Sequence, residues 1–203
     1  MSITIPEFDL CQPGTEPGWQ MVSSERMFDN PHVNVDLNRY NTPGRPQANQ
    51  PWMVVGRKAA VAIAPVLADG RFVLISQERL PVQQTLWEFP AGQIDREVTC
   101  ESIVETALGE LHEEAGIELD PQAGKLTPMG WFFPSQGFTN EHVYLFHAEP
   151  VCVVCQPKPE DSEHISSVRY VGAGELRRMI AENEITNALS LALFARMAAK
   201  GLL

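Results

Sequence analysis

The sequence of 203 residues predicts an α+β fold in which helices pack on a mixed β-sheet. Three observations support this prediction. Strand-like apolar runs lie on both sides of one clearly delimited central helix, a tight-turn dipeptide joins two of these runs, and the chain closes with two stretches of helical periodicity. A succession of strands, a helix, more strands and then helices is typical of a sheet covered by helices.

Residues 1–50 are rich in proline, asparagine and glycine, and their apolar residues form only short patches, such as those around Trp19 and Val22. We expect irregular structure and short strands here rather than a stable unit. From Trp52 onward the apolar runs become longer. The sequence therefore predicts two parts, a strand-containing segment over residues 1–50 and the main domain over residues 51–203.

The main domain begins with a predicted hairpin. Two strand-like runs over residues 59–67 and 72–76 flank Asp69-Gly70, a dipeptide that favours a two-residue turn. A central helix is predicted over residues 102–115, and Gly116 ends it because glycine readily adopts the left-handed conformation of a helix C-cap. Later strands are predicted at residues 131–133, 143–146 and 168–171, and later helices around residues 176–180 and over residues 185–201.

Charge and hydropathy exclude two classes of partner. Lys and Arg number 15 and Asp and Glu 26, which gives a formal net charge of −11. Nucleic acid selects basic surfaces, so we expect no nucleic-acid partner. No apolar stretch approaches the roughly 18 residues that span a bilayer, and the N-terminus lacks the pattern of a signal peptide. We expect a cytoplasmic protein with no membrane partner, in which local cations or metal ions meet any anionic substrate.

The four cysteines are Cys11, Cys100, Cys152 and Cys155. The last two form a Cys-x-x-Cys pair, but they lie in a β-branched run that predicts a strand. On a strand, residues three apart point to opposite faces, so the two sulfurs would not share a metal. A second Cys or His pair at zinc spacing is also missing. We therefore predict buried, inert thiols.

The central helix carries Glu110, Glu113 and Glu114. Spacings of three and four residues place these carboxylates on one helical face, with Cβ atoms about 5–6 Å apart. Like charges so close repel one another, which a chain accepts when cations fill the gap. Hard oxygen ligands in this arrangement suit Mg²⁺ or Mn²⁺, which can hold a pyrophosphate and orient a water. A solvated acidic face is the alternative.

Residues 92–117 resemble the Nudix box, in which a Gly and a Glu precede Arg-Glu-x-x-Glu-Glu-x-Gly. The second half stands here as Gly-Glu-Leu-His-Glu-Glu-Ala-Gly-Ile over residues 109–117. The resemblance implies a Nudix-like α/β/α sandwich with a mixed β-sheet and a small N-terminal β-rich appendage. It also implies the metal ligands, which are Glu110, Glu113, Glu114 and the carbonyl of Ala91.

Two positions depart from the family pattern. Eight residues, rather than the usual five, separate Gly92 from Glu101, and a loop tolerates such an insertion. Gly109 stands where the family carries an arginine that pairs with the carboxylates and holds their rotamers. Glycine removes this pairing and costs about 1 kcal/mol of helix stability relative to alanine.

Flanking segments are similar to those of ADP-ribose pyrophosphatases. Residues 87–92, Trp-Glu-Phe-Pro-Ala-Gly, resemble the lead-in of that group, and residues 77–79, Gln-Glu-Arg, resemble its Gln-Tyr-Arg strand end. Residues 134–141 resemble its Pro-Ser-x-Gly loop with a trailing glutamate, and residues 160–165 its acidic loop. The likeness implies that residues 51–203 form a Nudix hydrolase domain.

The resemblance also assigns roles to single residues. Glu113 and Glu141 are candidate catalytic residues, and Glu163 in the acidic loop is the candidate general base. Arg79 is the candidate for a substrate phosphate, because a guanidinium matches phosphate oxygens; an ion pair with nearby acids is the alternative. The other candidates for contacting the substrate are Phe28, Trp52 and Pro134, with Trp19 as a further aromatic; packing is the alternative for the aromatic side chains.

The resulting hypothesis is Mg²⁺- or Mn²⁺-dependent hydrolysis of the pyrophosphate bond of ADP-ribose or a related nucleoside diphosphate sugar. The products would be a nucleoside monophosphate and a sugar phosphate. Residues 1–50 are expected to mediate homodimerisation and base binding, as in related enzymes. Two alternatives stay open: a Nudix-fold ligand-binding or sensor module weakened in turnover, which Gly109 favours, and a hydrolase of another diphosphate such as a GDP-sugar.

Overall fold

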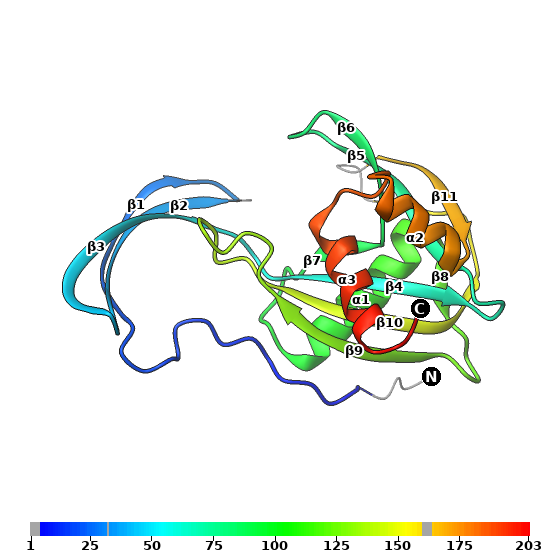
Figure 1. The fold of residues 1–203 in the computed structure, drawn as a ribbon, viewed down its shortest axis with the longest axis horizontal. Coiled ribbons are helices and arrows are strands. Elements are labelled where there is room, and N and C mark those ends of the chain that lie inside the picture. Colours follow the sequence, from blue (N-terminus) through cyan, green and yellow to red (C-terminus); the bar gives the residue numbers. More distant parts are fainter. Residues whose placement is uncertain (1–4, 32, 160–163) are drawn as a thin grey trace.

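The computed structural model describes residues 5–31, 33–159 and 164–203, which form a body and a long arm (Figure 1). In Figure 1 the arm curves away from the body and consists of three strands in blue and cyan. It is an antiparallel sheet in the order β1–β2–β3. Its strands are β1 (Gln20–Asp29), β2 (Asn34–Thr42) and β3 (Arg45–Gly56).

The arm corrects the prediction of short strands over residues 1–50. Strand β1 has 10 residues and β3 has 12, and β3 runs past residue 50 toward the body. Every residue of β1 is exposed, so no alternation of buried and exposed positions marks the strand in the sequence. Backbone hydrogen bonds to the neighbouring strand define it instead.

The body is built on a mixed sheet in the order β11–β5–β4–β10–β8, with β6 beside β5, β7 beside β4 and β9 beside β10. Strands β4 and β10 are parallel, and the other pairs that the structure describes are antiparallel. The strands are β4 (Ala60–Leu67), β5 (Phe72–Arg79), β6 (Gln84–Glu88), β7 (Ala91–Gln93), β8 (Ile117–Leu119), β9 (Lys125–Phe132), β10 (Val143–Val153) and β11 (Ile165–Val171).

Three helices cover the two faces of this sheet, namely α1 (Cys100–Ala115), α2 (Ala173–Ala181) and α3 (Ala188–Ala199). Alternate residues of β4 belong to different cores. Val61 and Ile63 pack in the core that contains the apolar side of α1. Ala62 and Ala64 pack in the core that contains α2 and α3. This division confirms the predicted α+β fold with helices on both faces of a mixed sheet.

The predicted hairpin between β4 and β5 is confirmed. Gly70 has a φ of 83°, in the left-handed region that glycine adopts without strain. The Leu67 N–H donates to the Arg71 carbonyl at 2.9 Å, which closes the turn. The Asp69 carboxylate accepts the Arg71 N–H at 3.1 Å, so both residues of the Asp-Gly dipeptide contribute to the turn.

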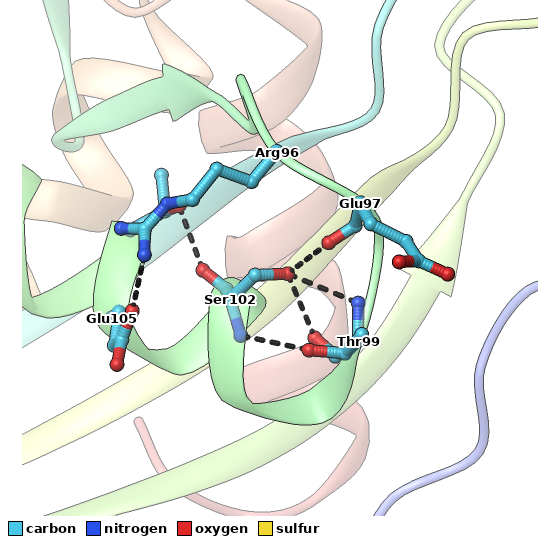
Figure 2. Close-up of polar contacts among 6 residues, drawn as sticks. Arg96, Glu97, Thr99, Ser102 and Glu105 are labelled. Carbon is cyan, nitrogen blue, oxygen red and sulfur yellow. Dashed lines mark hydrogen bonds and ion pairs between the residues drawn. The ribbon is translucent and has the colours of Figure 1, made fainter.

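Helix α1 begins at Cys100, two residues before the predicted start, because Thr99 caps it (Figure 2). The Thr99 hydroxyl accepts the Ser102 N–H at 3.1 Å, and the Ser102 hydroxyl accepts the Thr99 N–H at 3.0 Å. The Ser102 hydroxyl also donates to the Glu97 carbonyl at 2.7 Å. A serine at the third helical position replaces the usual Glu or Gln of this box, so the sequence did not signal the cap. The cap closes the long loop after Gly92.

The C-terminal end of α1 lies where the sequence predicts it. Gly116 has a φ of 64°, and its N–H donates to the His112 carbonyl at 3.0 Å. The last helix also forms, over a shorter range than predicted, because Asn187 caps its start by accepting the Ser190 N–H at 2.8 Å. Among the described residues, no helix has the length and apolar character that crossing a membrane requires.

Candidate active site

Two of the three helix glutamates lie against β7. Glu114 is fully buried, and its Oε2 accepts the Ala91 N–H at 2.8 Å. The Glu110 carboxylate occupies the space beside Gly92 that a side chain would fill, because a Cβ built on Gly92 would overlap its Oε1. The structure therefore joins Gly92 and the helix carboxylates, which are 18 residues or more apart in the sequence, in one small region.

The third glutamate is placed differently. Glu113 is exposed, and its Oε1 lies 3.8 Å from the position of a Cβ on Gly109. Across residues 5–31, 33–159 and 164–203, no three His, Cys, Asp or Glu side chains form a preformed metal cluster. Adjacent helix positions point about 100° apart, so Glu113 and Glu114 meet different surroundings. The donors themselves fit Mg²⁺ or Mn²⁺, because all are oxygen ligands.

A further candidate acid, Glu141, lies near the start of β4. Ala60 pairs with Gln93 of β7 on one side and with Val143 of β10 on the other. Neighbouring strands lie about 4.8 Å apart, so Gln93 and Val143 are about 10 Å apart. Glu141 precedes Val143 by two residues and thus lies at the same end of the sheet as Gly92. The catalytic role of Glu141 stays a prediction.

Arg57 accompanies Glu141 and was not among the predicted site residues. Its Nε lies 3.6 Å from Glu141 Oε1. The next residue, Lys58, pairs with Asp95 at 2.6 Å just beyond β7. Each of these two cations thus lies beside an acidic side chain, in a chain whose net charge is −11. In the sequence, Arg57 and Lys58 are two consecutive basic residues with no sign of a role. Their positions beside Glu141 and Asp95 become visible only in the structure.

The loop of residues 134–141 is fixed to strand β3. The Trp52 indole N–H donates to the Gly137 carbonyl at 2.8 Å, and the Val55 N–H donates to the Phe138 carbonyl at 2.7 Å. The Arg57 N–H donates to Asn140 Oδ1 at 3.0 Å. Trp52 therefore lies at the loop that contains Pro134, with about half of its surface exposed.

Phe28 lies further from this loop. It pairs with Val35, which pairs with Val55, so two strand spacings separate it from the strand that carries Trp52. Its side chain is exposed on β1. The structure thus fixes Trp52 to the loop that contains Pro134 and leaves Phe28 across the arm.

A cavity of about 1060 Å³ lies between the N-terminal segment and the loop after β9. Trp19 and Tyr40 line it from the arm side, and Trp131 and Phe133 line it from the body. The rings of Trp131 and Phe133 stand edge to face at 5.4 Å. Trp19, one of the aromatics suggested for stacking on a base, thus faces a concave space with further aromatic walls.

Arg79 is held in an ion pair. Its Nε and Nη2 donate to the two carboxylate oxygens of Glu88 at 3.0 and 2.7 Å, and Glu88 is 1% exposed. The ion pair that the sequence left as an alternative is therefore present, and the phosphate role of Arg79 stays a prediction. Glu163, the candidate general base, lies outside the described residues.

The cysteine prediction is corrected in part. Cys11 is buried as expected, whereas Cys100, Cys152 and Cys155 are partly exposed, and all four thiols are free. Strand β10 ends at Val153, so Cys155 lies after the strand and not on it. The β-branched run continues to Val154, one residue beyond Val153, which forms the last pair with β8. The run therefore predicted a strand that was too long at this end.

The body is an α/β/α sandwich in which one helix carries three glutamates. Comparisons with known proteins identify its family. The NUDIX domain family matches residues 56–193, more than half of the chain. The protein therefore belongs to the Nudix family of hydrolases.

Several known proteins resemble the chain over most of its length. The ADP-ribose pyrophosphatase of Bacillus subtilis (strain 168) is 27% identical over 167 residues, which cover 82% of this chain and 85% of that protein. The ADP-ribose pyrophosphatase of Mycobacterium tuberculosis is 27% identical over 177 residues, which cover 87% and 82%. The crystal structure of an ADP compounds hydrolase has a TM-score of 0.70 at 13% identity and covers 91% of this chain and 97% of that one, which shows the shared fold.

Replacing Gly109 by arginine is expected to raise both stability and metal affinity. Only Glu113 Oε1, at 3.8 Å, lies near the position of a Cβ on Gly109, so the site has room. Arginine is a better helix former by about 1 kcal/mol and adds a cation beside Glu113. The melting temperature and kcat/KM against Mg²⁺ concentration measure the two effects. Gly109→Ala is the matched control, because it raises stability without adding charge.

A loss of activity in the arginine variant alone would contradict this expectation. It would mean that a different cation already serves the carboxylates. Arg79 pairs with Glu88 and Arg96 pairs with Glu105, each at 2.7 Å (Figure 2 shows the second pair).

Proposed function

We propose that this Nudix hydrolase cleaves the pyrophosphate bond of ADP-ribose or a related nucleoside diphosphate sugar with the aid of Mg²⁺ or Mn²⁺. The products would be a nucleoside monophosphate and a sugar phosphate. The observation that carries the proposal is the packing of Glu110 and Glu114 against Gly92 and Ala91 of β7. The names of the two relatives that cover more than four-fifths of the chain support the choice of substrate.

Glu110, Glu113 and Glu114, with the Ala91 carbonyl, would hold the divalent ions. The ions would supply positive charge to the diphosphate and lower the pKa of a bound water. Burial of Glu114 and its hydrogen bond to Ala91 fix one carboxylate in place, whereas exposed Glu113 is free to turn toward a ligand. This combination suits a site in which one ligand is preorganised and another adjusts when the ion binds.

Residues at the start of β4 would position the substrate and the water. Arg57 and Lys58 offer the cations that an anionic diphosphate needs near an acidic helix. Glu141, held by Arg57 at 3.6 Å, is the described candidate for orienting the attacking water, with Glu163 as the candidate base. The aromatic cavity of Trp19, Trp131 and Phe133 offers ring faces against which a base would stack.

A panel of ADP-ribose, other ADP-sugars and GDP-sugars with Mg²⁺ tests the proposal, with products identified by mass spectrometry. We expect AMP and ribose 5-phosphate from ADP-ribose and no turnover in excess EDTA. Cleavage of a GDP-sugar in preference to ADP-ribose would reassign the substrate. Tight binding of ADP-ribose without turnover would instead support the binding-module alternative.

The protein would act as a homodimer through its arm. Every residue of β1 is exposed, and apolar side chains on the arm such as Met21, Met27, Trp52 and Met53 are about half exposed. Exposed apolar surface of this extent favours association with a second surface. Sedimentation at micromolar concentration is expected to give a dimer, and a monomer there would refute the idea.

A further inference from the structure

A thiol, an imidazole and a carboxylate lie next to one another at the C-terminal end of α1. Cys155 Sγ lies 3.9 Å from His112 Nε2, and His112 Nδ1 lies 3.0 Å from Glu118 Oε1. These residues come from three places in the fold: the segment after β10, the last turn of α1, and β8. All three side chains are at least partly exposed, so a small molecule can reach them.

The carboxylate determines which imidazole nitrogen faces the sulfur as an acceptor. Glu118 is an acceptor, so the nitrogen that faces it, Nδ1, carries the hydrogen. In the neutral ring Nε2 then holds the lone pair, and it accepts the S–H of Cys155. A thiol hydrogen-bonded to a nitrogen base that a third group orients is the arrangement of an activated sulfur nucleophile.

The backbone holds Cys155 in this position. Its N–H donates to the Gly116 carbonyl at 3.2 Å, and the Val154 N–H donates to the same carbonyl at 2.9 Å. A Cβ on Gly116 would overlap the Cys155 carbonyl, so the two segments are in direct contact. Further along, the Lys158 N–H donates to the Glu113 carbonyl at 2.7 Å. The sulfur is therefore presented by a segment fixed to the helix end.

The other three cysteines lack this environment. Cys152 Sγ donates to the Glu118 carbonyl at 3.7 Å, and Cys100 Sγ donates to the Phe8 carbonyl at 4.0 Å. Both of these acceptors are carbonyl oxygens and not a nitrogen base. Burial raises the pKa of the Cys11 thiol, which favours its protonated, unreactive form. Among the residues that the structure describes, Cys155 is the only one of the four thiols that faces a nitrogen acceptor.

We propose that Cys155, activated by His112 and positioned through Glu118, is a thiol-modification site that exchanges with low-molecular-weight disulfides. The Cys155 sulfur attacks one sulfur of the disulfide, a new S–S bond forms, and the old S–S bond breaks. The thiol proton, held in the hydrogen bond to Nε2, ends on the departing sulfur. One thiol and one disulfide give one mixed disulfide and one thiol, so electrons and atoms balance.

The test uses the full chain and glutathione disulfide as the probe at neutral pH, with each cysteine followed by peptide mass spectrometry. Cys155 is expected to form the mixed disulfide about ten times faster than Cys152. Cys152 is the internal control, because it is also partly exposed and lies three residues away. Equal rates at Cys155 and Cys152 would overturn the proposal.

Two variants test the roles of the partners. His112→Gln is expected to reduce the Cys155 rate to that of Cys152, and circular dichroism checks that the exposed substitution leaves the fold intact. Glu118→Gln keeps the backbone carbonyl that Cys152 contacts, so the Cys155 rate is expected to fall while the Cys152 rate stays constant. An unchanged ratio of the two rates in His112→Gln would overturn the proposal. Because the readout is thiol chemistry, the result is independent of the proposed hydrolase activity.

Discussion

Replacing Glu113 or Glu114 by glutamine is expected to lower kcat by roughly a hundredfold or more, because each change removes a charge on which divalent-ion binding depends. The two variants differ in what else they disturb. Glu113 is exposed, so its loss leaves packing intact. Glu114 is buried, but glutamine keeps an oxygen that accepts the Ala91 N–H. Activity against Mg²⁺ concentration and the melting temperature separate catalysis from stability.

Glu105→Gln is the matched control on the same helix. Glu105 is exposed and pairs with Arg96 on the side of α1 near its cap (Figure 2). An exposed ion pair contributes about 1 kcal/mol or less, so neither kcat nor the melting temperature is expected to change much. A Glu113→Gln enzyme with the unaltered rate would show that the helix carboxylates are not the metal site.

The body of the fold was predictable because its elements bury one face or both. Strand β4 is buried from Ala60 to Val66, and its turn to β5 carries the Asp-Gly dipeptide. Helix α1 places Ile103, Ala107 and Leu111 on one buried face. Such periodic burial leaves a pattern in the sequence. The strands β7 and β8, with three residues each, are too short to leave one.

The arm was predicted poorly for the opposite reason. Strand β1 buries no residue, and β3 is mostly exposed, with glutamine and asparagine in its first half and an apolar run only near its end. The strands of the arm are stabilised by hydrogen bonds to one another. A short window of sequence does not show which strands will pair. The eight-residue segment between Gly92 and Glu101 was likewise expected as a loop, and only the structure shows that it contains the Thr99 cap.

For the site, the sequence supplied the carboxylates but not their surroundings. The spacing of Glu110, Glu113 and Glu114 predicts one helical face, and the structure divides that face between β7 and solvent. Arg57 became a candidate only through its contact with Glu141, because the two are 84 residues apart in the chain. Strand pairing in the sheet determines which distant residues become neighbours. A single sequence does not show that pairing locally.

Replacing Gly92 by alanine is expected to lower kcat/KM by roughly 10- to 100-fold while changing the melting temperature little. A Cβ at this position would overlap the Glu110 carboxylate, so that carboxylate must leave β7. The overlapping atom is the end of a flexible side chain, and the backbone at Gly92 does not have a positive φ. The variant therefore displaces the proposed metal ligand Glu110 without straining the fold. Steady-state kinetics at several Mg²⁺ concentrations measure the effect.

Gly174→Ala is the control, because nothing lies within 4 Å of a Cβ at Gly174 and the residue lies in α2, away from β7. The decisive measurement is the double variant Gly92→Ala with Glu110→Gln. If alanine acts by moving the Glu110 carboxylate, the double variant loses little more activity than Glu110→Gln alone, because the two changes remove one interaction. Additive losses would mean that Gly92 contributes through the β7 backbone itself, and full activity in Gly92→Ala would mean that catalysis does not need Glu110 at β7.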